Sequence, residues 1–172
     1  MNTHNNIVLI GMPAVGKSTV GLILARTLNY NFLDTDTFIQ EQEGTALSDI
    51  IDKKGINGFC RIEETHVLSI QANHTVISTG GSVVYGKRAM EHLKANGCIV
   101  YLTADISLLM SRLSDPEKRG VIRKPGQTLE SLLAERDRLY KSYADIVVIC
   151  PEGDIPEVTA SRVLVSLDVL HG

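Results

Sequence analysis

The sequence contains no tryptophan, and only 5% of its 172 residues are aromatic. Its three cysteines, Cys60, Cys98 and Cys150, lie far apart, so the spacing predicts neither a disulfide framework nor a cysteine zinc site. We expect reduced thiols and a cytoplasmic protein. Glycine (14 residues) and proline (5 residues) are not in excess, which excludes collagen and low-complexity arrays.

Long apolar runs and an excess of positive charge are also missing. No stretch approaches the roughly 20 apolar residues of a membrane span, and the first apolar run, residues 7–10, is too short for a signal peptide. The 20 acidic residues outnumber the 17 basic ones, giving a net charge of −3. Proteins that bind nucleic acid or anionic membranes are usually strongly basic. We therefore expect neither as a partner, whereas a local basic site could still bind a small anion.

Short β-branched runs alternate along the chain with longer amphipathic stretches. The predicted strands cover residues 7–10, 31–33, 75–78, 98–102 and 145–149. The predicted helices cover residues 17–29, 38–43, 46–52, 57–72, 87–95, 105–113 and 128–140, with a last helix that is capped by Asp154 and ends near residue 170. The length predicts a single α/β domain, residues 1–172. The alternation predicts a parallel sheet covered by helices on both faces.

Residues 11–18 read G-M-P-A-V-G-K-S, the phosphate-loop pattern G-x-x-x-x-G-K-S, between a predicted strand and a predicted helix. Such a loop turns successive backbone N–H groups around an oxyanion, and the following helix presents its positive N-terminus to the same charge. Lys17 would reach the β- and γ-phosphates, and the Ser18 hydroxyl would bind Mg²⁺. The motif predicts nucleotide binding, and the short chain favours a small kinase or a nucleotide switch.

Polar and glycine residues follow the next two strands at the edge of the sheet where ligands bind. Asp34 and Asp36 follow the strand at 31–33. Phosphoryl transfer needs a group that anchors Mg²⁺ and a base for the attacking hydroxyl, which two carboxylates could supply. The alternative is that they cap the next helix. Gly80 and Gly81 let backbone N–H groups approach a ligand or form a plain tight turn.

Two basic segments remain as candidates. The stretch 114–127 contains Lys118, Arg119, Arg123 and Lys124 and is interpreted either as a lid that closes over phosphates or as a solvated surface loop. Arg136 and Arg138 lie two apart on a predicted helix, so at most one of them is expected to face the site. The five histidines are scattered and form no cluster.

Taken in order, these motifs resemble the shikimate kinase family over nearly the whole chain. The resemblance rests on the phosphate loop and on L-D-T-D at 33–36, F-C-R-I-E at 59–63, T-G-G-S at 79–82, R-G-V-I at 119–122, R-D-R-L-Y at 136–140 and A-D at 144–145. It implies a three-layer P-loop fold with a five-stranded parallel sheet, a substrate-binding segment at about 34–62 and a lid at about 114–126. We expect a monomer.

Members of this family move the γ-phosphate of ATP to the 3-hydroxyl of shikimate. The resemblance therefore implies a phosphotransferase with an alcohol acceptor, with Mg²⁺ as cofactor and ATP and a small molecule as partners. Carried over by position, the catalytic residues are Lys17, Asp36 and Arg119. The ATP-binding residues are Gly11, Ala14, Val15, Gly16, Lys17, Ser18, Thr19, Arg112 and Arg119. The metal ligands are Ser18 and Asp34, and the substrate-binding residues are Asp36, Arg61, Gly80, Gly81 and Arg136.

The chain departs from the family pattern mainly in the acceptor half. Cys60 stands where the family has a second carboxylate-binding arginine, although Glu63, which would orient that arginine, is present. Arg61 is adjacent, but one helix position is a turn of about 100°, so it reaches the pocket only if the helix is re-registered. Ser82 replaces the third glycine of the turn. Two alternatives therefore stay open: a kinase of another hydroxylated carboxylate, hydroxy amino acid or polyol, and an ATP-binding regulatory protein without catalysis.

Overall fold

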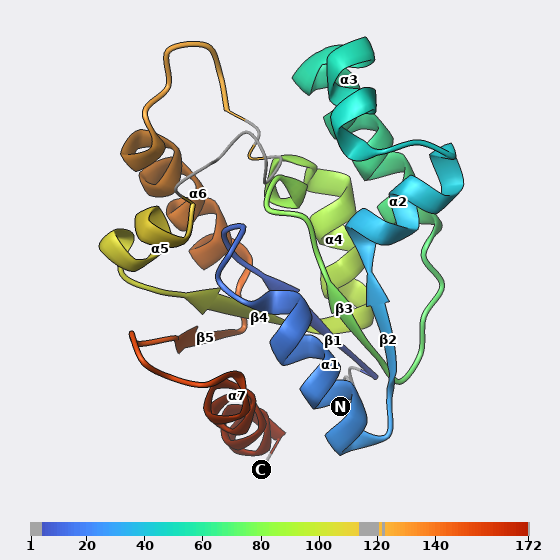
Figure 1. The fold of residues 1–172 in the computed structure, drawn as a ribbon. Helices are drawn as coiled ribbons and strands as arrows, with labels where there is room; N and C mark the ends of the chain where they lie inside the picture. The colour runs from blue at the N-terminus through green and yellow to red at the C-terminus, as the bar shows by residue number, and fades with distance from the viewer. Residues whose placement is uncertain (1–4, 114–120, 122, 172) are drawn as a thin grey trace.

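The computed structural model describes residues 5–113, 121 and 123–171, and its centre is a parallel β-sheet (Figure 1). The strands are β1 (Asn6–Ile10), β2 (Asn31–Asp34), β3 (Thr75–Ser78), β4 (Gly97–Thr103) and β5 (Ile146–Ile149). Their order across the sheet is β2-β3-β1-β4-β5, and every adjacent pair is parallel. The predicted five-stranded parallel sheet is confirmed.

Helices cover both faces of this sheet. They are α1 (Lys17–Leu28), α2 (Thr35–Glu43), α3 (Leu47–Ser69), α4 (Lys87–Asn96), α5 (Ile106–Arg112), α6 (Leu129–Tyr143) and α7 (Pro156–His171), with a 3₁₀ turn η1 (Val83–Tyr85). Helices α1 and α7 pack against each other, and α3 and α4 do the same. Crossovers between parallel strands are right-handed, so the direction of each connection across the sheet decides which face its helix covers. The connection from β1 to β2 runs in one direction and places α1 on one face. The connections from β2 to β3, β3 to β4 and β4 to β5 run in the opposite direction and place α3, α4 and α6 on the other face (Figure 1).

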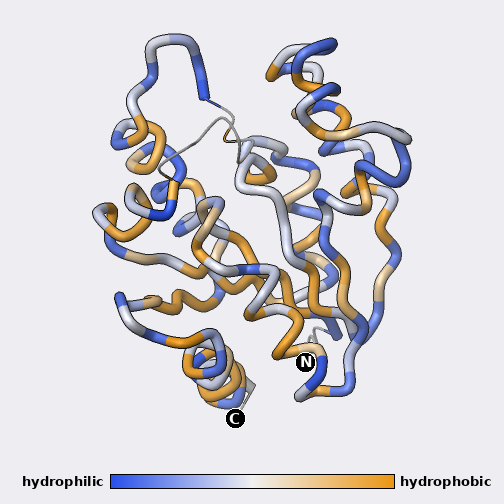
Figure 2. The backbone as a smooth tube through the Cα atoms, in the orientation of Figure 1, coloured by the Kyte–Doolittle hydropathy of each residue, from blue (hydrophilic) through white to orange (hydrophobic). Residues whose placement is uncertain are grey.

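The core lies between these layers, as the apolar central strands in Figure 2 show. The four apolar residues of β1 are at most 5% exposed, in keeping with a strand covered on both sides. Cys98 and Cys150 are buried as predicted, and all three cysteines are free thiols. In the described part of the chain, no helix is long and apolar enough to cross a membrane.

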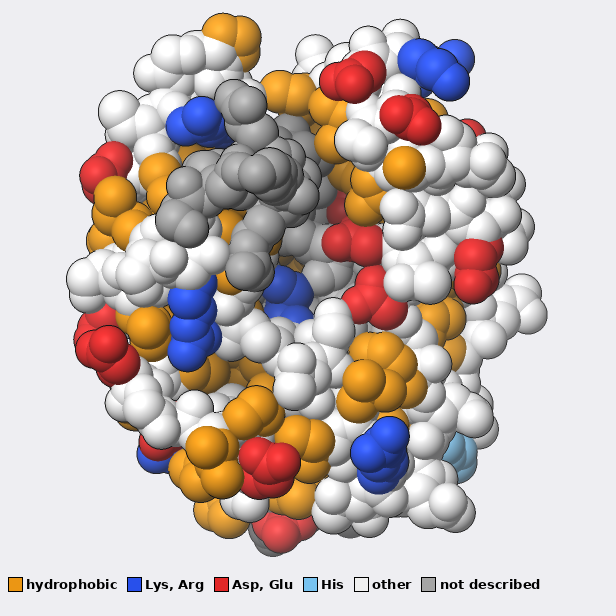
Figure 3. Space-filling view, in the orientation of Figure 1, with side chains coloured by type: hydrophobic (Ala, Val, Ile, Leu, Met, Phe, Trp, Pro, Cys, Tyr) orange, Lys and Arg blue, Asp and Glu red, His pale blue; other side chains and the backbone are white. Residues whose placement is uncertain are grey.

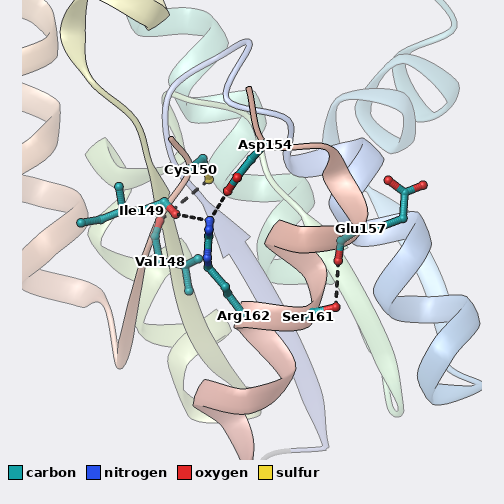
Figure 4. A network of polar contacts seen from close by, with 7 residues as sticks. All are labelled: Val148, Ile149, Cys150, Asp154, Glu157, Ser161 and Arg162. Atoms are coloured by element: carbon teal, nitrogen blue, oxygen red, sulfur yellow. Dashed lines mark hydrogen bonds and ion pairs between the residues drawn. The ribbon is translucent and has the colours of Figure 1, made fainter. Parts of the chain in front are cut away.

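The main differences from the predicted helices concern the starts of α2 and α7 and the continuity of α3. Helix α2 begins at Thr35 rather than at residue 38, because the Asp34 carboxylate caps it. The two helices predicted at 46–52 and 57–72 are continuous as α3, with a kink at Gly55, whose φ of 69° lies in the left-handed region. Asp154 does not cap α7, which begins at Pro156; its carboxylate is paired with Arg162 instead (Figure 4).

The sheet register brings three loops together at one edge. Leu9 and Asp34 are both aligned with Ser78 across the β1–β3 and β2–β3 pairs. The loops that follow β1, β2 and β3 therefore start side by side. This edge is where open parallel sheets bind ligands.

Candidate functional site

A cavity of about 490 Å³ opens at this edge of the sheet. Figure 3 shows the hollow, with acidic and basic side chains facing one another across it. Its lining comes from the phosphate loop, the ends of β2 and β3, and helices α3 and α6: Pro13, Ala14, Gly16, Lys17, Ser18, Thr19, Asp34, Asp36, Leu47, Ile51, Phe59, Thr79, Gly80, Gly81, Ser82 and Arg136. Most of the residues proposed from the sequence thus meet in one place.

The phosphate loop has the backbone that its glycines predict. Gly11 has a φ of 144°, and a Cβ there would lie 2.3 Å from the Leu102 carbonyl oxygen, so no other residue fits. Gly16 precedes α1 with a φ of 105°. Lys17 is 8% exposed, and its Nζ donates hydrogen bonds to the carbonyl oxygens of Gly11 (2.8 Å) and Met12 (2.9 Å). Burial lowers the pKa of Lys17 to about 8, which leaves it mostly charged at neutral pH.

Ser18 and Asp34 are hydrogen-bonded to each other. Ser18 Oγ donates to Asp34 Oδ2 at 2.6 Å and lies 3.1 Å from Ser78 Oγ. The other carboxylate oxygen of Asp34 accepts from the backbone N–H groups of Asp36 and Thr37, so the capping alternative is correct for this oxygen. A hydroxyl and a carboxylate at the mouth of a phosphate loop are the hard oxygen ligands that Mg²⁺ prefers, so the residues present fit that ion.

Asp36 lies in the first turn of α2 and lines the cavity. Burial and the neighbouring charge of Asp34 raise its pKa to about 6, while Lys17 acts in the opposite direction. Asp36 is therefore a stronger base than an ordinary carboxylate and is still ionised at neutral pH. These are the properties of a general base.

Gly80 and Gly81 are required by close packing within the site. A Cβ on Gly80 would lie 2.6 Å from Asp36 Oδ1, and one on Gly81 would lie 2.7 Å from Pro13 Cδ and 3.0 Å from Arg136 Nη1. The Gly80 N–H donates to Thr35 Oγ1 at 3.0 Å. The expectation that this N–H faces a ligand is therefore not met at Gly80, because the group is already hydrogen-bonded inside the protein.

Arg136 supplies a buried cation at the cavity wall. It is 1% exposed, its Nε donates to Tyr85 Oη at 3.4 Å, and its guanidinium lies 5.4 Å from the centre of the Tyr85 ring. Arg138, two positions later on α6, is exposed, so one of the pair faces the site as predicted. A buried guanidinium at a cavity wall suits an anionic group of a ligand.

The sequence did not predict the contact between Glu63 and Ser82. Ser82 Oγ donates to Glu63 Oε2 at 2.7 Å, and Glu63 is 2% exposed. Burial raises the pKa of Glu63 to about 7; the charge of Asp36 acts in the same direction, and the Ser82 hydrogen bond and Arg136 oppose it. The available signal was that a polar residue replaces a glycine where an acidic side chain points inward.

Arg61 was predicted to bind substrate but is not brought into the site, and Arg119 lies outside the described residues. Arg61 is exposed on α3 and does not line the cavity, so the prediction that it binds substrate is wrong. The reason is that one position along a helix turns the side chain by about 100°, away from the direction of residue 60. Cys60 is half-buried, and burial followed by the charge of Glu63 raises its thiol pKa, so it is no activated nucleophile. Arg119 and most of the predicted lid lie outside the described residues.

A further cavity of about 270 Å³ shares Ala14, Gly16 and Thr19 of the phosphate-loop region with the first. Its lining includes Ala14, Val15, Gly16, Thr19, Val20, Arg112, Cys150, Pro151, Asp154, Pro156 and Thr159. Arg112 Nη1 donates to the Ala14 carbonyl at 3.4 Å. Arg162 Nη1 contacts both the Asp154 carboxylate and, at 3.4 Å, the Ile149 carbonyl, which ties the loop after β5 to α7 (Figure 4).

The comparisons with known proteins agree on one family. The family model described as "Shikimate kinase" matches residues 13–167. Shikimate kinases of Actinobacillus succinogenes and Pasteurella multocida are 36% and 35% identical to this chain, over the full length of both proteins in each case. A solved shikimate kinase of Acinetobacter baumannii in complex with shikimate superposes with a TM-score of 0.84 at 30% identity, covering 96% of this chain and 94% of that one. The Aquifex aeolicus shikimate kinase gives 0.80 at 33%, covering 95% and 96%.

Proposed function

The chain belongs to the shikimate kinase family, and from this premise we propose that it transfers the γ-phosphoryl group of ATP to the 3-hydroxyl of shikimate, giving shikimate 3-phosphate and ADP. The observation that carries the proposal is the meeting of three features in one cavity: a phosphate loop, a carboxylate of raised pKa at Asp36 and a buried guanidinium at Arg136. Each serves one requirement of the reaction. The phosphate loop binds the phosphates, Asp36 accepts the proton, and Arg136 binds the carboxylate of the acceptor.

The nucleotide is expected to span the two cavities. Its base would lie in the smaller one, against Arg112 and the loop that Arg162 holds, and its phosphates would follow the phosphate loop. The Lys17 ammonium would exchange its carbonyl partners for phosphate oxygens and neutralise the charge that develops during transfer. Arg119 would close from the lid, which is a prediction from the resemblance.

Mg²⁺ is expected at Ser18 and Asp34, whose oxygens already lie at hydrogen-bond distance from each other. When bound, the ion neutralises phosphate charge. The Asp34 carboxylate is held in place because its second oxygen caps α2. The protein thus supplies a fixed oxygen ligand with no conformational adjustment of its backbone.

Asp36 would accept the proton of the attacking hydroxyl. Its pKa of about 6 keeps it ionised at neutral pH and makes it basic enough to help. Arg136 would hold the acceptor carboxylate. The Gly80–Gly81 turn packs against both side chains. Transfer would then be in line, by positioning and charge neutralisation, without a covalent enzyme intermediate.

Several further features belong to the same proposal. The substrate-binding segment would be residues 34–62 and the lid residues 114–126, within a single domain. The enzyme would act as a monomer in the cytoplasm and need no nucleic acid or membrane partner.

A different acceptor is the second candidate, and one observation favours keeping it. Cys60 is neutral and Arg61 is exposed, so among the described residues Arg136 is the arginine that lines the cavity. A hydroxylated carboxylate, hydroxy amino acid or polyol would then compete with shikimate. A regulatory role without catalysis is disfavoured by Lys17, Asp34 and Asp36, which keep their places in the cavity.

A coupled ADP-release assay with a panel of such alcohols tests the proposal. Shikimate is expected to give the highest kcat/KM. A higher value for another alcohol would transfer the proposal to that acceptor. ATP binding without phosphorylated product from any acceptor would support the regulatory alternative.

A further inference from the structure

Glu63 is a buried carboxyl group behind the acceptor end of the large cavity. It is 2% exposed, and Oε2 accepts the hydrogen bond from Ser82. The other oxygen, Oε1, is buried and has no hydrogen-bond partner among the described residues. A buried carboxylate with an unpaired oxygen is costly, and the usual relief is to take up a proton.

A second carboxyl group, that of Asp36, lies beside the same glycine as Oε1. The same Cβ on Gly80 that would lie 2.6 Å from Asp36 Oδ1 would lie 2.7 Å from Glu63 Oε1, so the two oxygens converge on one glycine. The polar and charged groups that act on Glu63 come from three other segments: Asp36 from α2, the Ser82 hydroxyl from the turn after β3, and Arg136 from α6. On its own helix, Cys60 lies one turn before Glu63, and burial followed by the charge of Glu63 raises the pKa of the Cys60 thiol.

The charges of this region are poorly matched to an anionic acceptor. The described side chains that line the cavity include two cations, Lys17 and Arg136, and two carboxylates, Asp34 and Asp36. Glu63 adds a third carboxyl group behind the wall. An acceptor carboxylate bound to Arg136 would bring a further negative charge beside it, which disfavours the ionised form of Glu63.

Resting on the proposed function, we propose that Glu63 is a specificity-determining residue that takes up one proton from solvent when an anionic acceptor binds to Arg136. The acceptor then binds the protein form in which Glu63 is neutral. A neutral polyol brings no negative charge and would bind without this proton. The site therefore distinguishes hydroxylated carboxylates from neutral alcohols in a way that depends on pH.

The direction of the pH dependence follows from the environment of Glu63. Below its pKa of about 7 in the free protein, Glu63 already carries the proton and adds no pH dependence to acceptor affinity. Above it, the proton must be taken from solvent, and affinity falls by up to about tenfold per pH unit. The Ser82 hydroxyl stabilises the ionised form. Ser82→Ala would therefore raise the pKa and move the loss of affinity to higher pH.

Isothermal titration calorimetry of the full chain with shikimate at pH 8 tests this proposal. Titrations in phosphate and in Tris, which differ in ionisation enthalpy, give the number of protons taken up. The wild-type protein is expected to take up close to one proton. Its affinity should be about tenfold weaker at pH 8 than at pH 6.5, where shikimate itself is ionised throughout. Glu63→Gln should take up none and lose the pH dependence.

Glu64→Gln is the matched control. Glu64 is the next residue of α3, its carboxylate accepts a hydrogen bond from the backbone N–H of Arg88, and it does not line the cavity. It should behave as the wild type. Shikimate binding without proton uptake, or equal uptake by Glu63→Gln, would overturn the inference and leave the proposed function intact. Absence of shikimate binding by the wild type between pH 6 and 8.5 would overturn both.

Discussion

At the scale of single residues, the site depends on a few side chains whose environments give them unequal tasks. Asp34 and Asp36 are two positions apart, yet one is committed to Ser18 and a helix cap and the other faces the cavity with a raised pKa. Arg136 and Arg138 differ in the same way, one buried and one exposed. Residue type alone does not separate these roles, whereas burial and hydrogen-bond partners do.

Asp36→Asn removes the proposed proton acceptor and preserves the size of the side chain. We expect kcat to fall by about 10²- to 10⁴-fold, the usual contribution of a general base. Nucleotide affinity should stay within about threefold, because the amide leaves the phosphate loop unchanged. Steady-state kinetics and ADP binding measure the two effects. An unchanged kcat would remove Asp36 from this role.

Arg136→Met should weaken binding of the acceptor and leave binding of ATP unchanged. Loss of a buried guanidinium that pairs with a carboxylate costs about 2 kcal/mol or more, so the KM of shikimate should rise at least about 30-fold. Arg138→Met is the matched control on the exposed side of α6 and should leave both KM values unchanged. Equal effects of the two substitutions on the KM of shikimate would show that the carboxylate binds elsewhere.

Glu63→Gln should change how stability depends on pH. Glu63 has a folded-state pKa of about 7 against an ordinary value of 4.5, so between these values the folded state holds more of the proton. Its contribution is most favourable below pH 4.5, declines as the pH rises to 7 and is constant above, a total of about 3 kcal/mol. Denaturant unfolding at pH 5 and pH 8 should show a smaller decline for the variant. An equal decline in the unfolding free energy of both proteins between pH 5 and pH 8 would contradict the raised pKa of Glu63.

At the scale of elements, the sequence predicts what local periodicity determines and misses what packing determines. The strands are short apolar runs covered on both faces, so they can be recognised from the sequence as continuous apolar segments. The phosphate loop is a contiguous motif whose glycines are required by the backbone conformation, so it can be recognised in the same way. The Glu63–Ser82 contact joins α3 to the turn after β3, and no local pattern encodes it. The exposed position of Arg61 follows from the rotation of a helix whose partner surfaces the sequence does not specify.

The loop between β5 and α7 offers a test at this scale. Arg162 joins α7 to the Asp154 carboxylate and the Ile149 carbonyl, and Asp154 lines the smaller cavity. Arg162→Ala should loosen that loop and raise the KM of ATP by about fivefold, the equivalent of about 1 kcal/mol. The KM of shikimate should not change. Arg88→Ala, on the exposed surface of α4, is the matched control. An unaffected KM for ATP in Arg162→Ala would show that the nucleotide base binds away from this loop.

At the scale of the whole molecule, the topology brings together segments that are distant in the sequence. The order β2-β3-β1-β4-β5 places the loops after β1, β2 and β3 at one edge, and α6 reaches across to supply Arg136. The nucleotide half of this site carries the phosphate-loop motif, whereas Cys60 and Ser82 in the acceptor half differ from the pattern that the resemblance implies.

The most direct measurement is to identify the product. Purified protein, ATP, Mg²⁺ and shikimate are incubated, and the product is analysed by ³¹P–¹H correlation NMR. We expect a phosphate ester whose phosphorus couples to the proton on carbon 3 of shikimate. A phosphate on another hydroxyl, or unmodified shikimate after prolonged incubation with protein that binds ATP, would contradict it.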